Sequence, residues 1–271
     1  CMIEGYGGGI TVQAGYGQQT RHVTLRRNVI VDNWAAHPDA LTGRAQGIYT
    51  NEIHGLLIEE NFLDHNGWKE GVANAGPDIY SHNMYIQSTN YDVVVRGNIS
   101  ARASSHGLQL RPGGIAEGNL FIEDSIAFFV SNGDGDGSDN LAVDNVVVHG
   151  SRKGLRPDGY SRGFGIHMKN IAGAEVIRNI VAHGANCKKG LTGLENVYTE
   201  NNVVYQWGTE TDPGLFPDPW RTMYTYDAAL GGPGTVENFL SEVRQMSKQN
   251  WRPEYAAAGV VPYFQEAFGL I

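Results

Sequence analysis

The chain has 271 residues, of which 41% are hydrophobic and 18% are charged, and its formal net charge is −9. The hydrophobic content predicts a packed core instead of a disordered chain. The negative charge argues against a nucleic-acid-binding protein, which would normally be basic. No apolar run approaches the roughly 20 residues that a membrane helix requires, so we expect no membrane span.

A short repeated element predicts the first set of strands. In each copy a small residue is followed by alternating apolar and variable positions, the alternation that is typical of a β-strand. The copies lie at residues 9–13, 47–51, 83–87, 107–111, 127–131 and 165–169. We therefore expect residues 10 and 12, and their equivalents, to face the core, and residues 11 and 13 to face outward.

A second element is a short apolar stretch that ends in asparagine and is followed by another apolar residue. Its asparagines are Asn28, Asn61, Asn98, Asn119, Asn145, Asn179 and Asn202. Repetition of this kind predicts a solenoid of stacked coils. Asparagine amides at a turn can hydrogen-bond from one coil to the next, so we assign these residues a structural role.

The two elements alternate in a fixed order, and the segments that return from the asparagine to the next coil vary most in length. The long returns predict loops at roughly 33–45, 65–81, 132–142 and 149–163. Insertions that gather on one face of a repeat protein usually mark its binding face. We therefore expect a substrate groove beside the outward residues of the first element.

The repeat ends near Asn202, which divides the chain into two parts. Residues 1–210 are predicted to form a right-handed parallel β-helix. Residues 211–271 are predicted to form a turn-rich segment and a C-terminal helical cap, because a solenoid needs its end covered. Helical spacing of apolar residues predicts one helix over 235–249, with Thr235 as its N-cap, and a second over 254–267.

The asparagine repeats, the Gly-Ile-x-Val strands and the single-sided loops resemble the pectate-lyase-like superfamily of β-helices, over roughly residues 5–210. The resemblance implies a carbohydrate-active protein: a polysaccharide lyase, a glycoside hydrolase, a uronate epimerase or a tailspike. Lyases of this superfamily typically use Lys and Arg, with calcium or a positive side chain as neutraliser, and Arg111 and Lys169 match those residue types. The chain lacks the paired acidic motif of polygalacturonases and the Asp-Pro-His-Asp motif of alginate epimerases.

Stacking the first element aligns outward side chains from neighbouring coils into columns. The columns gather aromatic, imidazole, amide and cationic groups, which can stack on sugar rings and bind hydroxyls and carboxylates. We expect Tyr49, Asn51, Gln87, Gln109 and His167 to bind substrate. A purely structural ladder of buried, hydrogen-bonded histidines is the alternative interpretation.

The residue types in these columns fit β-elimination of a uronate polymer better than hydrolysis. Elimination needs a group that neutralises the sugar carboxylate, a base for the α-proton and an acid for the leaving oxygen. The candidate catalytic residues are His82, Tyr85, His106, Arg111 and Lys169. Hydrolysis needs two opposed carboxylates, and the outward columns contain none.

A metal ion could replace the cationic neutraliser. The loop 132–139 resembles the start of a calcium loop, with Asp134, Asp136 and Asp139 as candidate ligands, although Asp139 stands where an EF-hand has glycine. A flexible acidic turn explains the same residues. We therefore expect either no cofactor or Ca²⁺.

These observations predict a secreted or periplasmic polysaccharide lyase that acts on an alginate-like or pectin-like glycan. One alternative is a glycoside hydrolase whose acids come from the loops, for example Asp39, Asp78 or Asp134. A second alternative is a non-catalytic glycan-binding module. A register slip of one residue would turn every named outward residue inward, so the site prediction depends on the strand register.

Overall fold

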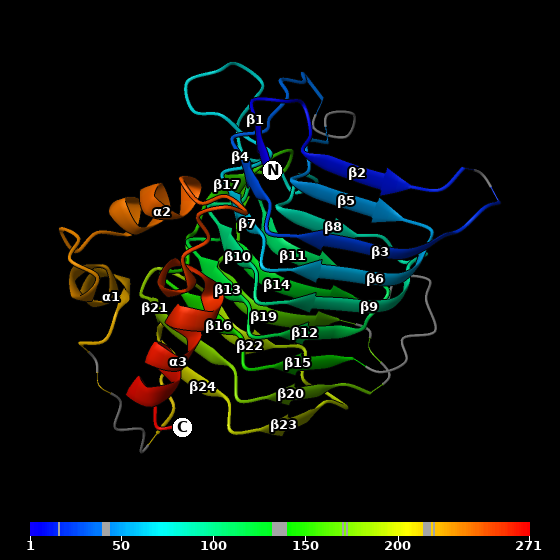
Figure 1. Ribbon diagram of the computed structural model, residues 1–271. Coiled ribbons are helices and arrows are strands. Elements are labelled where there is room, and N and C mark those ends of the chain that lie inside the picture. The colour runs from blue at the N-terminus through cyan, green and yellow to red at the C-terminus, as the bar shows by residue number, and fades with distance from the viewer. Residues whose placement is uncertain are drawn as a thin grey trace.

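Each repeat folds into one coil of a parallel β-helix, as the alternating pattern predicts (Figure 1). The computed structural model describes residues 1–15, 17–39, 44–131, 140–169, 171, 173–213, 218 and 220–271. Each coil contributes one strand to each of three sheets, and the strands within these sheets pair in parallel. The predicted fold class is therefore confirmed.

The three sheets are named by their order within a coil. The first sheet contains β2 (Ile10–Gln13), β5 (Ile48–Asn51), β8 (Met84–Ile86), β11 (His106–Leu110), β14 (Ile126–Ser131), β19 (Phe164–Lys169) and β22 (Lys189–Thr192). The second sheet contains β3 (Thr20–Arg26), β6 (Ile53–Glu59), β9 (Tyr91–Arg96), β12 (Ile115–Glu117), β15 (Leu141–Val143), β20 (Glu175–Ile177) and β23 (Tyr198–Glu200). The third sheet contains β1 (Met2–Glu4), β4 (Val29–Val31), β7 (Phe62–Asp64), β10 (Ile99–Ala101), β13 (Leu120–Ile122), β16 (Val146–Val148), β21 (Ile180–Gly184) and β24 (Val203–Trp207). A small antiparallel pair, β17 (Gly154–Leu155) and β18 (Tyr160–Ser161), lies in the loop 149–163.

The register of the first sheet is the one that the sequence predicts. Tyr85 pairs with Tyr49 on one side and with Gln109 on the other, and the column continues through Phe129 to His167. The alternate residues are buried in the solenoid core, as Leu108 and Leu110 illustrate. The outward columns are therefore real neighbours in space.

The seven asparagines form one continuous ladder at the turn between the second and third sheets. Each side-chain amide donates to the Oδ1 atom of the next asparagine, from Asn28 to Asn202, over 2.9 to 3.0 Å. The same Oδ1 atoms accept a backbone N–H from the preceding asparagine. The predicted structural role of these residues is confirmed.

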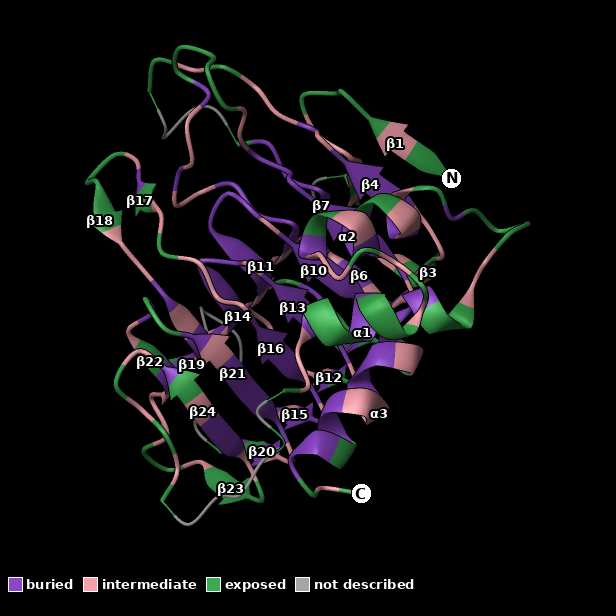
Figure 2. Cartoon of the chain, turned by 90° about the vertical axis from the view of Figure 1, so that its left-hand side faces the viewer, coloured by how far each residue is buried: buried purple, intermediate pink, exposed green. Residues whose placement is uncertain are grey.

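The third sheet is buried on both faces, which explains its uninterrupted apolar strands. One face packs in the solenoid core and the other packs against the C-terminal helices. These helices are α1 (Met223–Ala229), α2 (Val236–Arg244), the short 3₁₀ helix η1 (Pro253–Tyr255) and α3 (Ala257–Ala267). The helical cap therefore lies along one side of the stack of coils (Figures 1 and 2).

The cap contains the two predicted helices and a third. It covers the side of the third sheet instead of the end of the solenoid, and α2 ends at Arg244 instead of residue 249. Thr235 is the N-cap of α2, and its side chain accepts a hydrogen bond from the Asn238 N–H. The second predicted helix begins as η1 and continues as α3, whereas α1 was not predicted. Within the described part of the chain, no helix has the length and apolar character needed to cross a membrane.

Substitution of Asn119 by alanine is expected to lower the free energy of unfolding by about 3 kcal/mol, because it leaves several buried polar partners unsatisfied. The Asn119 side chain donates to Asn145 and to the Val95 carbonyl and accepts from Asn98. Asn28→Ala, at the exposed end of the ladder, should cost less than half as much. Equal losses of unfolding free energy in denaturant titrations of the two variants would contradict a ladder whose interior rungs contribute more to stability than its end.

Candidate active site

A cavity of about 530 Å³ opens over the outer face of the first sheet. Seven of the ten residues predicted to bind substrate or to catalyse line it: His82, Tyr85, His106, Gln109, Arg111, His167 and Lys169. They come from β8, β11 and β19 and from the segments that adjoin these strands. The structure therefore brings most of the predicted site together in one place.

The other three predicted residues stand beside the cavity, and two of them contact its lining. The Tyr49 ring packs on Tyr85, with 5.6 Å between ring centroids. The Gln87 Oε1 atom accepts a hydrogen bond of 2.9 Å from Arg111. Asn51 accepts a hydrogen bond from Thr89, which does not line the cavity. Gln87 therefore positions Arg111, whereas Asn51 belongs to the adjoining surface.

The loops contribute lining residues that the strand pattern did not single out. Arg44 comes from the loop 33–45, Ile79 and Tyr80 from the loop 65–81, and Arg162 from the loop 149–163. The clustering of long loops on one side predicted walls of this kind but gave no means of selecting individual side chains.

Imidazole and phenol rings form a stacked row across the coils. The rings of His82 and Tyr85 are 5.0 Å apart and nearly parallel, and those of His82 and His106 are 4.7 Å apart. Phe129 contacts His106 on one side and His167 on the other. Packing within this row therefore helps to fix the orientation of the histidines.

Hydrogen bonds define which nitrogen of His82 carries the proton. Gln46 donates from its amide to the Tyr80 carbonyl, so its Oε1 atom is free to accept. The His82 Nδ1 atom lies 2.8 Å from this oxygen and must be the donor. The Nε2 atom of His82 is buried and has no hydrogen-bond partner among the described residues, so it keeps an unused lone pair.

His106 has the same tautomer for a similar reason. The Ser105 hydroxyl donates to the Ser81 carbonyl over 2.8 Å. Its oxygen, 3.0 Å from the His106 Nδ1 atom, is therefore the acceptor in that contact. Both histidines thus have an unprotonated Nε2 atom, and that of His82 is buried.

Burial keeps both histidines neutral. It lowers the pKa of His82 to about 3, and nearby Arg44 reinforces this effect. Burial and the neighbouring His82 also hold the pKa of His106 well below its usual value. A negatively charged ligand in the cavity would raise both pKa values, because it would favour the protonated imidazole.

The charge of the cavity is opposite to that of the whole protein. The described lining residues include the cationic side chains of Arg44, Arg111, Arg162 and Lys169 and no carboxylate. Arg162 is paired with Asp158, whereas none of the other three has an ion pair with a described carboxylate. Arg111 donates to the Tyr85 hydroxyl oxygen over 3.0 Å.

Of the three carboxylates proposed for hydrolysis, the two that lie in the described part of the chain are not part of this cavity. Asp39 and Asp78 are absent from its lining. The candidate calcium ligands Asp134, Asp136 and Asp139 lie outside the described residues. Elsewhere in the described ranges, no group of three or more His, Cys, Asp and Glu side chains is arranged to hold a metal ion.

Comparison of the chain with protein-family models, with curated proteins and with solved structures finds no match. The interpretation of the site therefore depends on the geometry of its side chains.

The buried histidines make an acid-sensitive fold. The folded-state pKa of His82 lies below the unfolded value of about 6.5, so the unfolded state binds more protons and stability falls as the pH drops below 6.5. Between pH 7 and pH 5, protonation of this residue alone in the unfolded state should lower the free energy of unfolding by about 2 kcal/mol. His82→Gln should reduce the difference between the two pH values by that amount. Unfolding free energies at the two pH values measure it.

Phe129→Leu is the control for this experiment, because it alters the packing of the same cavity without removing a titratable group. It should lower stability equally at both pH values. An unchanged pH dependence in His82→Gln would show that the imidazole is not neutralised by folding.

Proposed function

We propose that the protein is a polysaccharide lyase of the pectate-lyase-like superfamily that cleaves a uronate-containing glycan by β-elimination. The observation that carries this proposal is the charge of the cavity. Its described lining residues include four cationic side chains and no carboxylate, in a protein of net charge −9. Such a site favours an anionic substrate.

Arg111 is the proposed neutraliser of the substrate carboxylate. Its guanidinium is fixed by Tyr85 and Gln87, which leaves further N–H groups for a bidentate contact with a carboxylate. Binding the carboxylate stabilises the negative charge that develops when the proton on the adjacent carbon is removed. Arg44 and Lys169 line the same cavity and add positive charge.

His82 and His106 are the two candidates for the base, and Tyr85 is the proposed acid. Each histidine has an unprotonated Nε2 atom. His106 is the favoured base, because the Nε2 atom of His82 is buried. The Tyr85 oxygen accepts from Arg111, so its own hydrogen remains available for the leaving glycosidic oxygen. Neutraliser, base and acid are thus supplied by adjacent coils, and the elimination requires no opposed carboxylates.

The surface beside the cavity supports a polymeric substrate. A neighbouring cavity of about 420 Å³ shares His167 and Lys169 with the first and extends to Gly193 and Asn196. Together the two cavities follow the first sheet across successive coils. A chain of several sugar units would occupy both.

Elimination is tested by following the ultraviolet absorbance of unsaturated uronates in mixtures of the protein with alginate, pectate, glycosaminoglycan and bacterial exopolysaccharide. We expect product on one polymer, and a loss of at least about 100-fold in kcat/KM for Arg111→Met and Tyr85→Phe. His82→Gln and His106→Gln decide which histidine is the base. A chelator arm tests whether the acidic loop 132–139 supplies calcium.

Arg96→Met is the matched control. Arg96 lies on the second sheet and pairs with Glu59, away from the cavity, so its loss should leave the rate unchanged. New reducing ends without ultraviolet-absorbing unsaturated uronates would show that the reaction is hydrolysis. Binding of a polymer without any cleavage would reduce the site to a glycan-binding surface.

A further inference from the structure

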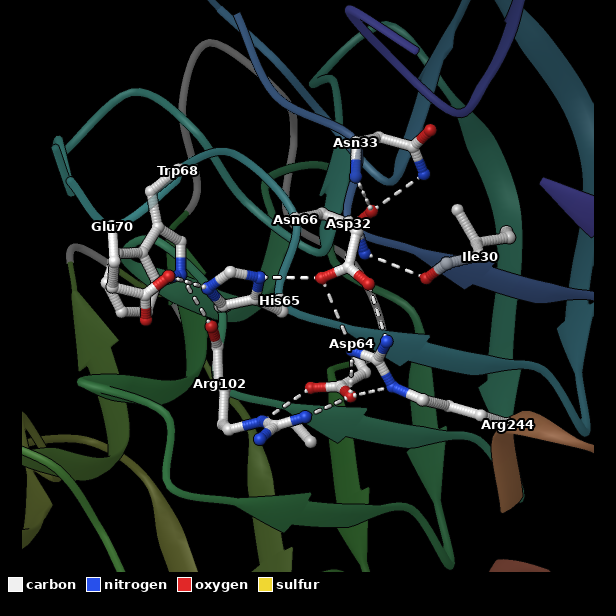
Figure 3. A network of polar contacts seen from close by, with 12 residues as sticks. Ile30, Asp32, Asn33, Asp64, His65, Asn66, Trp68, Glu70, Arg102 and Arg244 are labelled. Carbon is white, nitrogen blue, oxygen red and sulfur yellow. Dashed lines mark hydrogen bonds and ion pairs between the residues drawn. The ribbon is translucent and has the colours of Figure 1, made fainter. Parts of the chain in front are cut away.

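The three sheets of the solenoid differ in what covers their outer faces. The cavity of the candidate active site opens over the first sheet. The helical cap covers the third sheet, and Arg244 of α2 holds it there through ion pairs with Asp32 and Asp64 (Figure 3). In Figure 1 the helices lie to the left of the strands of the second sheet and do not cover them. The outer face of the second sheet is therefore open to contact with another molecule.

A row of aliphatic side chains crosses this open face. The parallel register aligns one outward position on each of four successive strands, β6, β9, β12 and β15. The side chains at this position are Leu57, Val94, Ile115 and Leu141, and each is partly exposed. None of them belongs to the solenoid core or to the cluster beneath the cap. Because neighbouring strands lie about 4.8 Å apart, the four form one continuous apolar strip, a feature that usually marks an interaction site.

A row of charged side chains runs beside the aliphatic row, two residues further along each strand. Its sign alternates over the first four coils, in the order Arg26, Glu59, Arg96 and Glu117. Arg26 and Arg96 both pair with Glu59, over 3.0 and 2.6 Å, and leave its side chain only 13% exposed. Glu117 is exposed, and no described residue forms an ion pair with it. The row therefore ends in a carboxylate that is free to pair with a cation from another molecule.

We propose that this face binds the same face of a second copy of the chain, in a dimer whose two-fold axis runs parallel to the strands between β9 and β12. This axis reverses the order of the coils but keeps the position along each strand. Val94 then lies over the partner's Ile115, and Leu57 lies over the partner's Leu141. Each aliphatic side chain is thus covered by another, in the aligned packing that two sheets commonly adopt.

The charged rows are complementary under the same axis. Arg96 lies over the partner's Glu117, and Glu117 lies over the partner's Arg96, so two equivalent ion pairs flank the aliphatic strip. No like charges face each other in either row, because Glu59 lies over the partner's Val143 and Arg26 over the partner's Ile177. A two-fold axis along the stack of coils would bring the charged rows together only as like charges. The alternation of sign therefore selects the axis that is parallel to the strands.

The size of the face predicts a weak dimer. Six strands overlap under this axis, from β3 to β20, and they span about 24 Å across the stack. A contact of this extent lies at the lower end of specific interfaces, so we expect a dissociation constant on the order of 10 µM. The dimer does not rest on the proposed lyase reaction, because the cavity lies over a different sheet, and the cleavage rate per chain should not depend on it.

Sedimentation velocity of the full chain, from about 1 µM to about 200 µM, tests the association. We expect the mass to rise with concentration from 29.5 kDa towards twice that value. Val94→Lys places an unpaired ammonium group at the centre of the interface in both copies and should weaken association at least about 100-fold. A mass that stays at the monomer value over the whole range would overturn the proposal.

Thr11→Lys is the matched control, because it adds the same charge at an exposed position of β2, outside the interface. It should associate like the unaltered chain, and circular dichroism verifies that both lysine variants are folded. Equal association of the two variants would show that the aliphatic strip is not the interface.

A charge reversal tests the arrangement of the two copies. Glu117→Arg should weaken association about tenfold, because it places an arginine over the partner's Arg96, and Arg96→Glu should do the same. The double variant restores opposite charges across the axis and should regain most of the affinity, although it does not restore the pair with Glu59. Failure of the double variant to recover, or assembly beyond a dimer, would rule out the two-fold arrangement.

Discussion

The hydrogen bonds between asparagine amides at one turn set the geometry on which the rest of the molecule depends. Each coil must bring an amide to the same height and angle as the one before it, because the donor and acceptor of every rung lie on different coils. The residue before each of these asparagines has a left-handed backbone, Arg27 and Gly97 among them. This turn is therefore the same in every coil, whatever happens elsewhere in the repeat.

A fixed turn makes the first sheet predictable from sequence. Once Asn98 and Asn119 are aligned, the alternation in each coil leaves one register in which Tyr85 and Gln109 both face outward, and the structure has that register. The protonation of the two buried histidines is harder to predict from the sequence. Their tautomers depend on Gln46 and Ser105, whose hydrogen bonds have no signature in a one-dimensional pattern.

The parts that sequence reasoning missed are those where distant segments meet. Arg44 and Arg162 reach the first cavity from loops whose path is set by tertiary contacts. One such contact is Arg156, which donates to the His37 and Asn74 carbonyls and so joins the loops 149–163, 33–45 and 65–81. The ion pairs of Arg244 with Asp32 and Asp64 could not be predicted for the same reason, because Arg244 comes from a helix more than 170 residues beyond Asp64. The helix α1 could not be predicted because it is too short to show a helical repeat of apolar residues.

The placement of the cap has a consequence for synthesis of the chain. The outer face of the third sheet presents apolar side chains such as Val29 and Phe62 from the earliest coils, and the helices that cover them come last. During N-to-C-terminal synthesis, the coils that form first must therefore leave this strip uncovered until residues 223–267 have been made. Arg244 then pairs with Asp32 and Asp64, so covering the strip also joins α2 to coils that were made much earlier.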